Sequence, residues 1–190
     1  MMMKYFYMAR IALHDHMSGR VRQATRFLVF ALQVTVMVIM WRMIYQFGYG
    51  PQAISFTNMC WYLGLAQMVL FSSPRLVSVI DEDIRSGNVA YFLTRPVPYL
   101  WVRFAEGTGA LLGMCCLYFT LGTAFIYSLA GGWPDSGPMS VVVALSSLVI
   151  ASLIHLLFQL CCGLSAFWTH EANTVYYAYQ KMFLLLGGCY

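Results

Sequence analysis

The side chains with the greatest capacity for chemistry are charged residues gathered in one short stretch of an otherwise apolar sequence. They are Asp81, Glu82, Asp83, Arg85 and Arg95, with Gly87 at a turn among them. Apolar residues recur at helical spacing around the acidic group, which predicts a short amphipathic helix whose polar face carries these charges. Such a face is typical either of a solvated loop or of a docking site for another protein.

A second group of polar side chains lies within long apolar runs. Its members are Gln33, Gln67, His155 and Gln159. His155 and Gln159 are four residues apart, so on a helix they share one face. Polar side chains buried in a membrane usually join helices through hydrogen bonds of about 0.6 kcal/mol each. We weigh that role against a place in a translocation path.

Other sequence patterns with chemical meaning are sparse. Ser165 lies in Gly163-Leu164-Ser165-Ala166, a fragment similar to the G-x-S-x of intramembrane serine proteases, so a hydrolase using Ser165 is the alternative function. Neither G-x-x-x-x-G-K-[ST] nor G-x-G-x-x-G occurs, and the cysteines lie in apolar runs without C-x-x-C spacing. We therefore expect no nucleotide, cofactor or metal site in this chain.

The composition indicates that the elements holding these residues lie in lipid. Of 190 residues, 61% are hydrophobic and 9% are charged, and the mean hydropathy is +0.68, whereas an ordinary soluble domain has roughly 25% charged residues. This excludes a disordered chain, a nucleic-acid-binding arm and a disulfide-stapled secreted module. A spanning helix needs about 20 apolar residues, so the length allows several spans and no soluble catalytic domain.

The predicted fold is an all-α polytopic membrane helix bundle. We expect a single transmembrane domain over residues 1–190, with four complete spans and a partial fifth, at residues 27–45, 57–73, 104–129, 139–167 and 182–190. The last segment is too short to cross a bilayer. An interfacial amphipathic helix is expected over residues 4–18, and a polar link over residues 169–180.

The distribution of Lys and Arg predicts the orientation. Five precede the first span, four lie in residues 75–103 and one is Lys181, against Arg42 alone on the other face. By the positive-inside rule, the N-terminus and residues 75–103 are cytoplasmic, and the turn at Trp133 is outside.

One segment carries a family resemblance. Ile84-Arg85-Ser86-Gly87-Asn88-Val89-Ala90-Tyr91-Phe92-Leu93-Thr94-Arg95-Pro96-Val97-Pro98-Tyr99-Leu100 resembles the I-R-S-G-x-[IL]-x-x-x-L-x-R-P-V-x-Y-L stretch of ABC-2-type transporter permeases, in the subfamily of small six-span proteins with a separate ATP-binding subunit. Shorter stretches are similar as well: Trp41-Arg42, Trp61 to Gln67, Ala166-Phe167-Trp168, Tyr179-Gln180-Lys181 and Leu186-Gly187-Gly188. The family continues with a proline-containing turn, so we expect this chain to stop within the fifth span.

The resemblance implies a permease subunit of an ATP-driven exporter in a bacterial inner membrane. The family assembles two permease subunits, like or unlike, with two ATP-binding subunits that bind ATP and Mg²⁺, so the resemblance implies a non-catalytic subunit surrounded by lipid, with no nucleic-acid partner. A coupling helix between spans two and three docks on the ATP-binding subunit, and residues 79–95 occupy that place here. The coupling residues implied are Asp81, Glu82, Asp83, Arg85, Gly87 and Arg95, and Gln33, Gln67, His155 and Gln159 are candidates for the translocation path.

Overall fold

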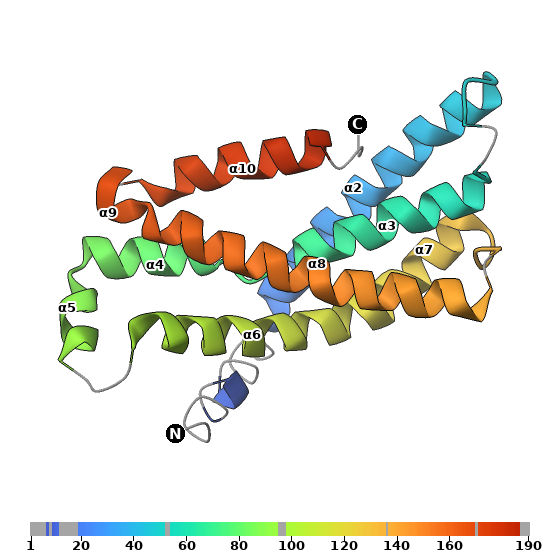
Figure 1. Cartoon of the computed structure of the whole chain (residues 1–190). Coiled ribbons are helices and arrows are strands. Elements are labelled where there is room, and N and C mark those ends of the chain that lie inside the picture. Colours follow the sequence, from blue (N-terminus) through green and yellow to red (C-terminus); the bar gives the residue numbers. More distant parts are fainter. Residues whose placement is uncertain are drawn as a thin grey trace. The chain divides into compact units, whose positions relative to one another are not determined.

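A computed structural model describes residues 7, 9–11, 19–51, 54–94, 98–135, 137–169 and 171–186. Within these residues every regular element is a helix, as Figure 1 shows. Four stretches are long and apolar enough to cross a membrane: Val21–Gln46, Phe56–Arg85, Tyr99–Ala130 and Met139–Thr169. The prediction of an all-α polytopic bundle is confirmed. The second stretch reaches Arg85 and includes a break at Pro74, whereas the sequence predicted a span ending at residue 73.

The chain divides into two compact units. Unit 1 comprises Met1–His16, Ser73–Leu112 and Leu153–Tyr190, and unit 2 comprises Met17–Ser72 and Gly113–Ser152. Two long helices, α6 (Tyr99–Leu117) and α8 (Pro138–Leu164), contribute one part to each unit.

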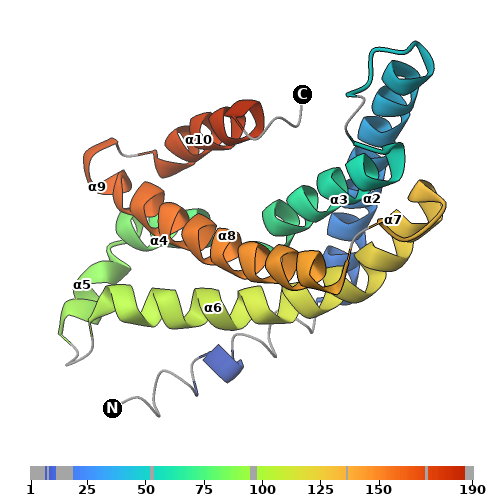
Figure 2. The same cartoon turned by 45° about the vertical axis from the view of Figure 1, so that its right-hand side comes forward.

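Unit 2 is built on two apolar helices that lie side by side, α2 (Arg20–Gln46) and α3 (Phe56–Ser72), visible in Figure 2. A π-helix, η1 (Tyr118–Gly122), and α7 (Thr123–Ala130) complete the third candidate span. The buried core residues of this unit come from all of these helices: Phe30, Val34, Val38, Cys60, Trp61, Met68, Met114, Tyr118 and Ile126. The turn after α7 is attached to α3, because Trp61 Nε1 donates to the Gly132 carbonyl at 3.0 Å and the ring of Trp133 stacks on Trp61.

Unit 1 holds the charged segment. It contains α4 (Leu76–Arg85), α5 (Asn88–Leu93), the first part of α6, the second part of α8, α9 (Ala166–Thr169) and α10 (Ala172–Leu186). Both short connecting helices, α5 and α9, lie at the same end of this unit in Figures 1 and 2. Pro74 has no backbone N–H and ends the preceding helix, so α4 begins as a separate helix.

The apolar side of α4 packs into the bundle instead of lying on its surface. Leu76, Val77 and Ile80 are buried. Gly163 on α8 makes the close approach possible, since a Cβ there would lie 2.8 Å from Cδ1 of Ile80. The sequence predicted an amphipathic helix here, and the structure places its apolar stripe against protein.

The fifth helix differs most from its predicted bounds. A polar link was expected over residues 169–180, but α10 begins at Ala172. Apolar side chains of α10 pack on the buried cluster of Val77, Cys162, Ala166 and Ala172; they are Val175, Tyr176 and Tyr179. This packing stabilises a helix in a segment whose polar composition predicted a link. Residues 187–190 lie outside the described chain, as does most of the interfacial helix expected over residues 4–18.

Candidate functional site

The charges of α4 divide between two environments. The sequence predicted one polar face carrying Asp81, Glu82, Asp83 and Arg85, and this prediction is wrong for two of them. Asp81 and Asp83 are 5% and 7% exposed, whereas Glu82 and Arg85 are exposed. Buried carboxylates need partners that compensate for lost hydration. Both have such partners, on different helices.

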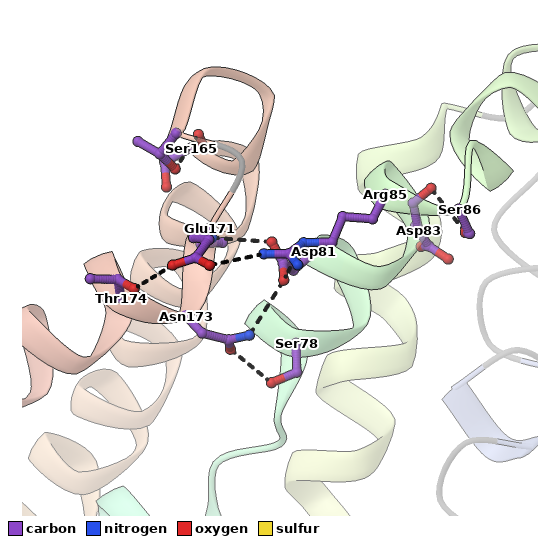
Figure 3. Close-up of polar contacts among 11 residues, drawn as sticks. Ser78, Asp81, Asp83, Arg85, Ser86, Ser165, Glu171, Asn173 and Thr174 are labelled. Atoms are coloured by element: carbon purple, nitrogen blue, oxygen red, sulfur yellow. Dashed lines mark hydrogen bonds and ion pairs between the residues drawn. The ribbon is translucent and has the colours of Figure 1, made fainter.

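Asp81 binds the start of α10. Its Oδ1 accepts a hydrogen bond from the backbone N–H of Ala172 at 3.1 Å, and its Oδ2 accepts one from Nδ2 of Asn173 at 3.3 Å (Figure 3). Arg85 Nε lies 3.3 Å from the same Oδ2. The first N–H groups of a helix have no partner within the helix, and its dipole favours negative charge there. The carboxylate of Asp81 therefore caps α10 from a neighbouring helix.

A second row of contacts joins the same two helices at their exposed edges. The Ser78 hydroxyl donates to Oδ1 of Asn173 at 3.1 Å, and Arg85 Nη2 lies 4.0 Å from Oε1 of Glu171 (Figure 3). The Thr174 hydroxyl donates to Oε2 of Glu171 at 3.2 Å. Exposed pairs of this kind contribute at most about 1 kcal/mol each. They therefore orient α4 and α10 relative to one another more than they stabilise the fold.

Asp83 faces the opposite side and binds α6. It accepts a hydrogen bond from the Tyr99 hydroxyl at 2.7 Å and forms an ion pair with Arg103. Arg103 also pairs with Glu106, three residues later on the same helix, at 2.6 Å, and its guanidinium lies 5.2 Å from the ring centroid of Phe92. One largely buried guanidinium thus joins α4, α5 and α6.

Gln159, fully buried on α8, fixes the beginning of α4. Its Oε1 accepts from the backbone N–H of Leu76 at 3.1 Å, and its Nε2 donates to the hydroxyl of Ser73. Leu76 is the first residue of α4, and the capping residue Arg75 makes no side-chain cap. The amide of Gln159 therefore satisfies a helix N-terminus that would otherwise be buried without a partner.

His155 joins α8 to α10. Its Nδ1 lies 3.1 Å from the Tyr179 hydroxyl. The contacts of His155 and Gln159 are hydrogen bonds that join helices, which is one of the two roles considered for these residues from the sequence. Gln67 lies in unit 2, fully buried, with Nε2 3.5 Å from the sulfur of Met37, and Gln33 is half-buried on α2. The four candidate path residues are thus divided between the two units.

Gly87 makes the turn between α4 and α5 in a left-handed conformation, with φ of 75°. A residue with a Cβ is strained there. Gly87 is exposed, as are Glu82 and Arg85. Arg95, the remaining candidate, lies outside the described residues.

Ser165 lies in the turn between α8 and α9 and makes a local contact. Its hydroxyl donates to the backbone carbonyl of Cys162 at 2.7 Å, a common pattern for serine near a helix end. Within the described part of the chain this carbonyl is the partner of the hydroxyl, and His155 pairs with Tyr179 instead. The described geometry gives the hydrolase alternative no support.

Sequence reasoning missed the partners that α4 has in other helices: Tyr99 and Arg103 for Asp83, and Ala172 and Asn173 for Asp81. A signal was present in the spacing. Asp81 follows Val77 by four residues and Asp83 follows Ile80 by three, so the two carboxylates stand at the two opposite edges of the apolar stripe.

Comparison with known proteins identifies a family. A family model described as an ABC-2 family transporter protein matches residues 30–187. The matched residues run from within α2 to the end of α10, so they include α4 and every helix to which it is attached. No curated protein and no solved structure matches the chain.

Proposed function

Because the chain belongs to the ABC-2 family of transporter proteins, we propose that it is a permease subunit driven by a separate ATP-binding subunit that docks on α4. Membership of this family supports the assignment of the chain as a multi-pass membrane permease of an ABC exporter. The observation that supports the docking site is the attachment of α4 to three helices, α6, α8 and α10, while one side remains exposed.

A docking helix can transmit motion to the rest of the permease only if it is rigidly attached to other helices. Gln159 holds the first turn of α4, Asp81 holds α10 and Asp83 holds α6. The opposite side presents Val79, Glu82 and Arg85 to solvent, and their spacing of three residues places neighbouring members on one face of a helix. This exposed stripe of α4, comprising Val79, Glu82 and Arg85, is the proposed contact with the ATP-binding subunit.

The assembly follows from the same proposal. Two permease subunits combine with two ATP-binding subunits, and ATP and Mg²⁺ bind to the latter, while this chain contributes no catalytic group. The protein lies in a bacterial inner membrane with its N-terminus and α4 on the cytoplasmic side, as the Lys and Arg distribution favours. Lipid is its other partner.

The proposed translocation path involves Gln33, Gln67 and His155 in preference to Gln159. The amide of Gln159 already uses its oxygen and its nitrogen to join helices in unit 1. In contrast, Oε1 of Gln67 and Nε2 of His155 are buried without a hydrogen-bond partner among the described residues. Buried polar atoms of this kind are the better candidates for meeting a polar group of a transported molecule.

The test is association with the ATP-binding subunit encoded beside the gene. The two chains are co-expressed and purified together in nanodiscs, using the unmodified permease, Glu82→Lys and Asp135→Lys. Both acidic residues are exposed, but Asp135 lies in the turn that is attached to α3 in unit 2. We expect Glu82→Lys to reduce recovery of the ATP-binding subunit at least fivefold and Asp135→Lys to leave it unchanged.

The contradicting results are equally specific. If the unmodified permease never retains the ATP-binding subunit, the proposed function fails. If the subunit is retained equally by Glu82→Lys and by a second stripe variant, Val79→Arg, the exposed stripe of α4 is a solvated surface and docking lies elsewhere.

A further inference from the structure

We propose that Asp81 is a positioning residue that fastens the start of α10 to α4, so that the two helices move as one body during transport. This inference rests on the proposed role of α4 in docking. It identifies α10 as the helix to which α4 transmits its motion.

The first argument is the kind of group that Asp81 binds. The backbone N–H of Ala172 lies at the first position of α10, and Ala172 is fully buried. A buried N–H without a water or protein partner is strongly disfavoured. The Asp81 oxygen at 3.1 Å is its partner, so α10 cannot move away from α4 without exposing or orphaning this group.

The second argument is the balance of charge around Asp81. The carboxylate accepts from two groups of α10, the Ala172 N–H and the Asn173 amide, and it pairs with Arg85 of its own helix (Figure 3). It is 5% exposed. Separation of the helices would break both hydrogen bonds from α10 to this carboxylate and leave its contact with Arg85, which opposes separation.

The third argument is the contrast with α6. The hydrogen bond to α10 joins the short side chain of Asp81 to the backbone N–H of Ala172. Few side-chain torsion angles can therefore change to keep this bond if α10 moves relative to α4. The link to α6 joins Asp83 to the long side chain of Arg103 and to the Tyr99 hydroxyl. A long side chain can follow a small displacement of the helix by changing rotamer. Motion of α4 therefore passes to α10 more directly than to α6.

Apolar packing continues the contact beyond the polar groups. Val77 of α4 belongs to the same buried cluster as Ala172, and Val175 and Tyr176 of α10 pack against it. The two helices thus share a core as well as a cap.

The experiment measures the proximity of the two helices in two states of the working complex. Ser78→Cys and Asn173→Cys are combined in a background without the native cysteines, because the Ser78 Oγ and Asn173 Oδ1 atoms lie 3.1 Å apart. Oxidative cross-linking is measured in the full complex with the ATP-binding subunit, without nucleotide and after trapping with ATP and vanadate. Loss of ATP hydrolysis verifies trapping, and each single cysteine variant serves as a control.

We expect the cross-link yield to agree within about twofold between the two states. A yield that falls at least tenfold in one state would show that the helices separate and would overturn the inference. Adding Asp81→Ala should reduce the yield in both states, whereas Asp81→Asn, which keeps an oxygen for the Ala172 N–H, should restore most of it. Equal yields in all three backgrounds would remove Asp81 from the positioning role.

These results are separable from the proposed function itself. If no ATP-binding subunit associates, the proposed function fails, and cross-linking in the permease alone still reports whether Asp81 holds α10. If the complex forms and hydrolyses ATP but the yield changes between states, the inference fails and the docking role of α4 stands.

Discussion

Asp81 and Asp83 are two positions apart on α4, and their carboxylates bind different helices. Asp81 accepts from the first backbone N–H of α10, and Asp83 pairs with Arg103 of α6. Successive positions on a helix differ in direction by about 100°, so residues two apart point to nearly opposite sides. One short helix therefore connects two others, with the exposed Glu82 between the two buried carboxylates.

Arg103 pairs with two carboxylates, so loss of its charge should lower stability more than loss of the charge on one of its partners. Arg103→Gln leaves both Asp83 and Glu106 without their cation, and removing one partner of a buried pair costs about 3–5 kcal/mol. Asp83→Asn leaves Arg103 paired with Glu106, so we expect a smaller loss. Thermal unfolding in detergent measures both variants. Equal losses, or a larger loss for Asp83→Asn, would contradict this account of the cluster.

The cap that Gln159 provides predicts a second effect on stability. Gln159→Leu leaves the Leu76 N–H and the Ser73 hydroxyl without the amide that binds them, at a cost of about 1–3 kcal/mol for an orphaned buried group. Gln33→Leu is the matched control, because Gln33 is half-buried on α2. We expect a lower unfolding temperature for Gln159→Leu than for Gln33→Leu. The reverse order would show that the cap contributes little.

The turn at Gly87 predicts a backbone effect. Its φ is 75°, a conformation that costs a residue with a Cβ roughly 1–2 kcal/mol. Gly87→Ala should therefore lower stability or recovery of the ATP-binding subunit, and Gly87→Asn should be tolerated better. Gly132→Ala is the control, since nothing lies within 4 Å of a Cβ there. If Gly87→Ala and Gly132→Ala behave alike in unfolding and co-purification, the turn is not required.

Orientation in the membrane is tested by cysteine accessibility. Glu82 and Asp135 are both exposed, so either can be replaced by Cys in a background without the native cysteines. We expect a membrane-impermeant maleimide to label the cysteine at position 135 in intact cells, and the one at position 82 only after the membrane is opened. The opposite pattern would reverse the positive-inside assignment.

The fold was largely predictable, and the contacts of α4 were not. Composition and hydropathy predicted an all-helical membrane bundle, because long apolar runs leave few other structures. The Arg103–Glu106 pair is a contact of the kind that spacing can reveal, since the two residues are three apart on one helix. The interactions of Asp81 and Asp83 join helices far apart in the sequence, and such pairings do not follow from local periodicity.

The start of α10 shows the same limit on local reasoning. Residues 172–180 contain enough polar side chains to resemble a link, yet α10 begins at Ala172. The carboxylate of Asp81, 91 positions earlier in the chain, provides the cap. The sequence did contain a usable signal in the spacing of Asp81 from Val77, which places this carboxylate on the apolar side of α4.

The most direct test of the central claim is site-specific photo-crosslinking from α4. A photoreactive benzoyl-phenylalanine replaces Glu82, and in a matched variant it replaces Asp135, in cells that co-express the ATP-binding subunit. Both positions are exposed, so neither substitution disturbs a buried contact. Docking on α4 predicts a cross-link to the ATP-binding subunit from position 82 and none from position 135. No cross-link from position 82, in cells where the two chains co-purify, would contradict docking on α4.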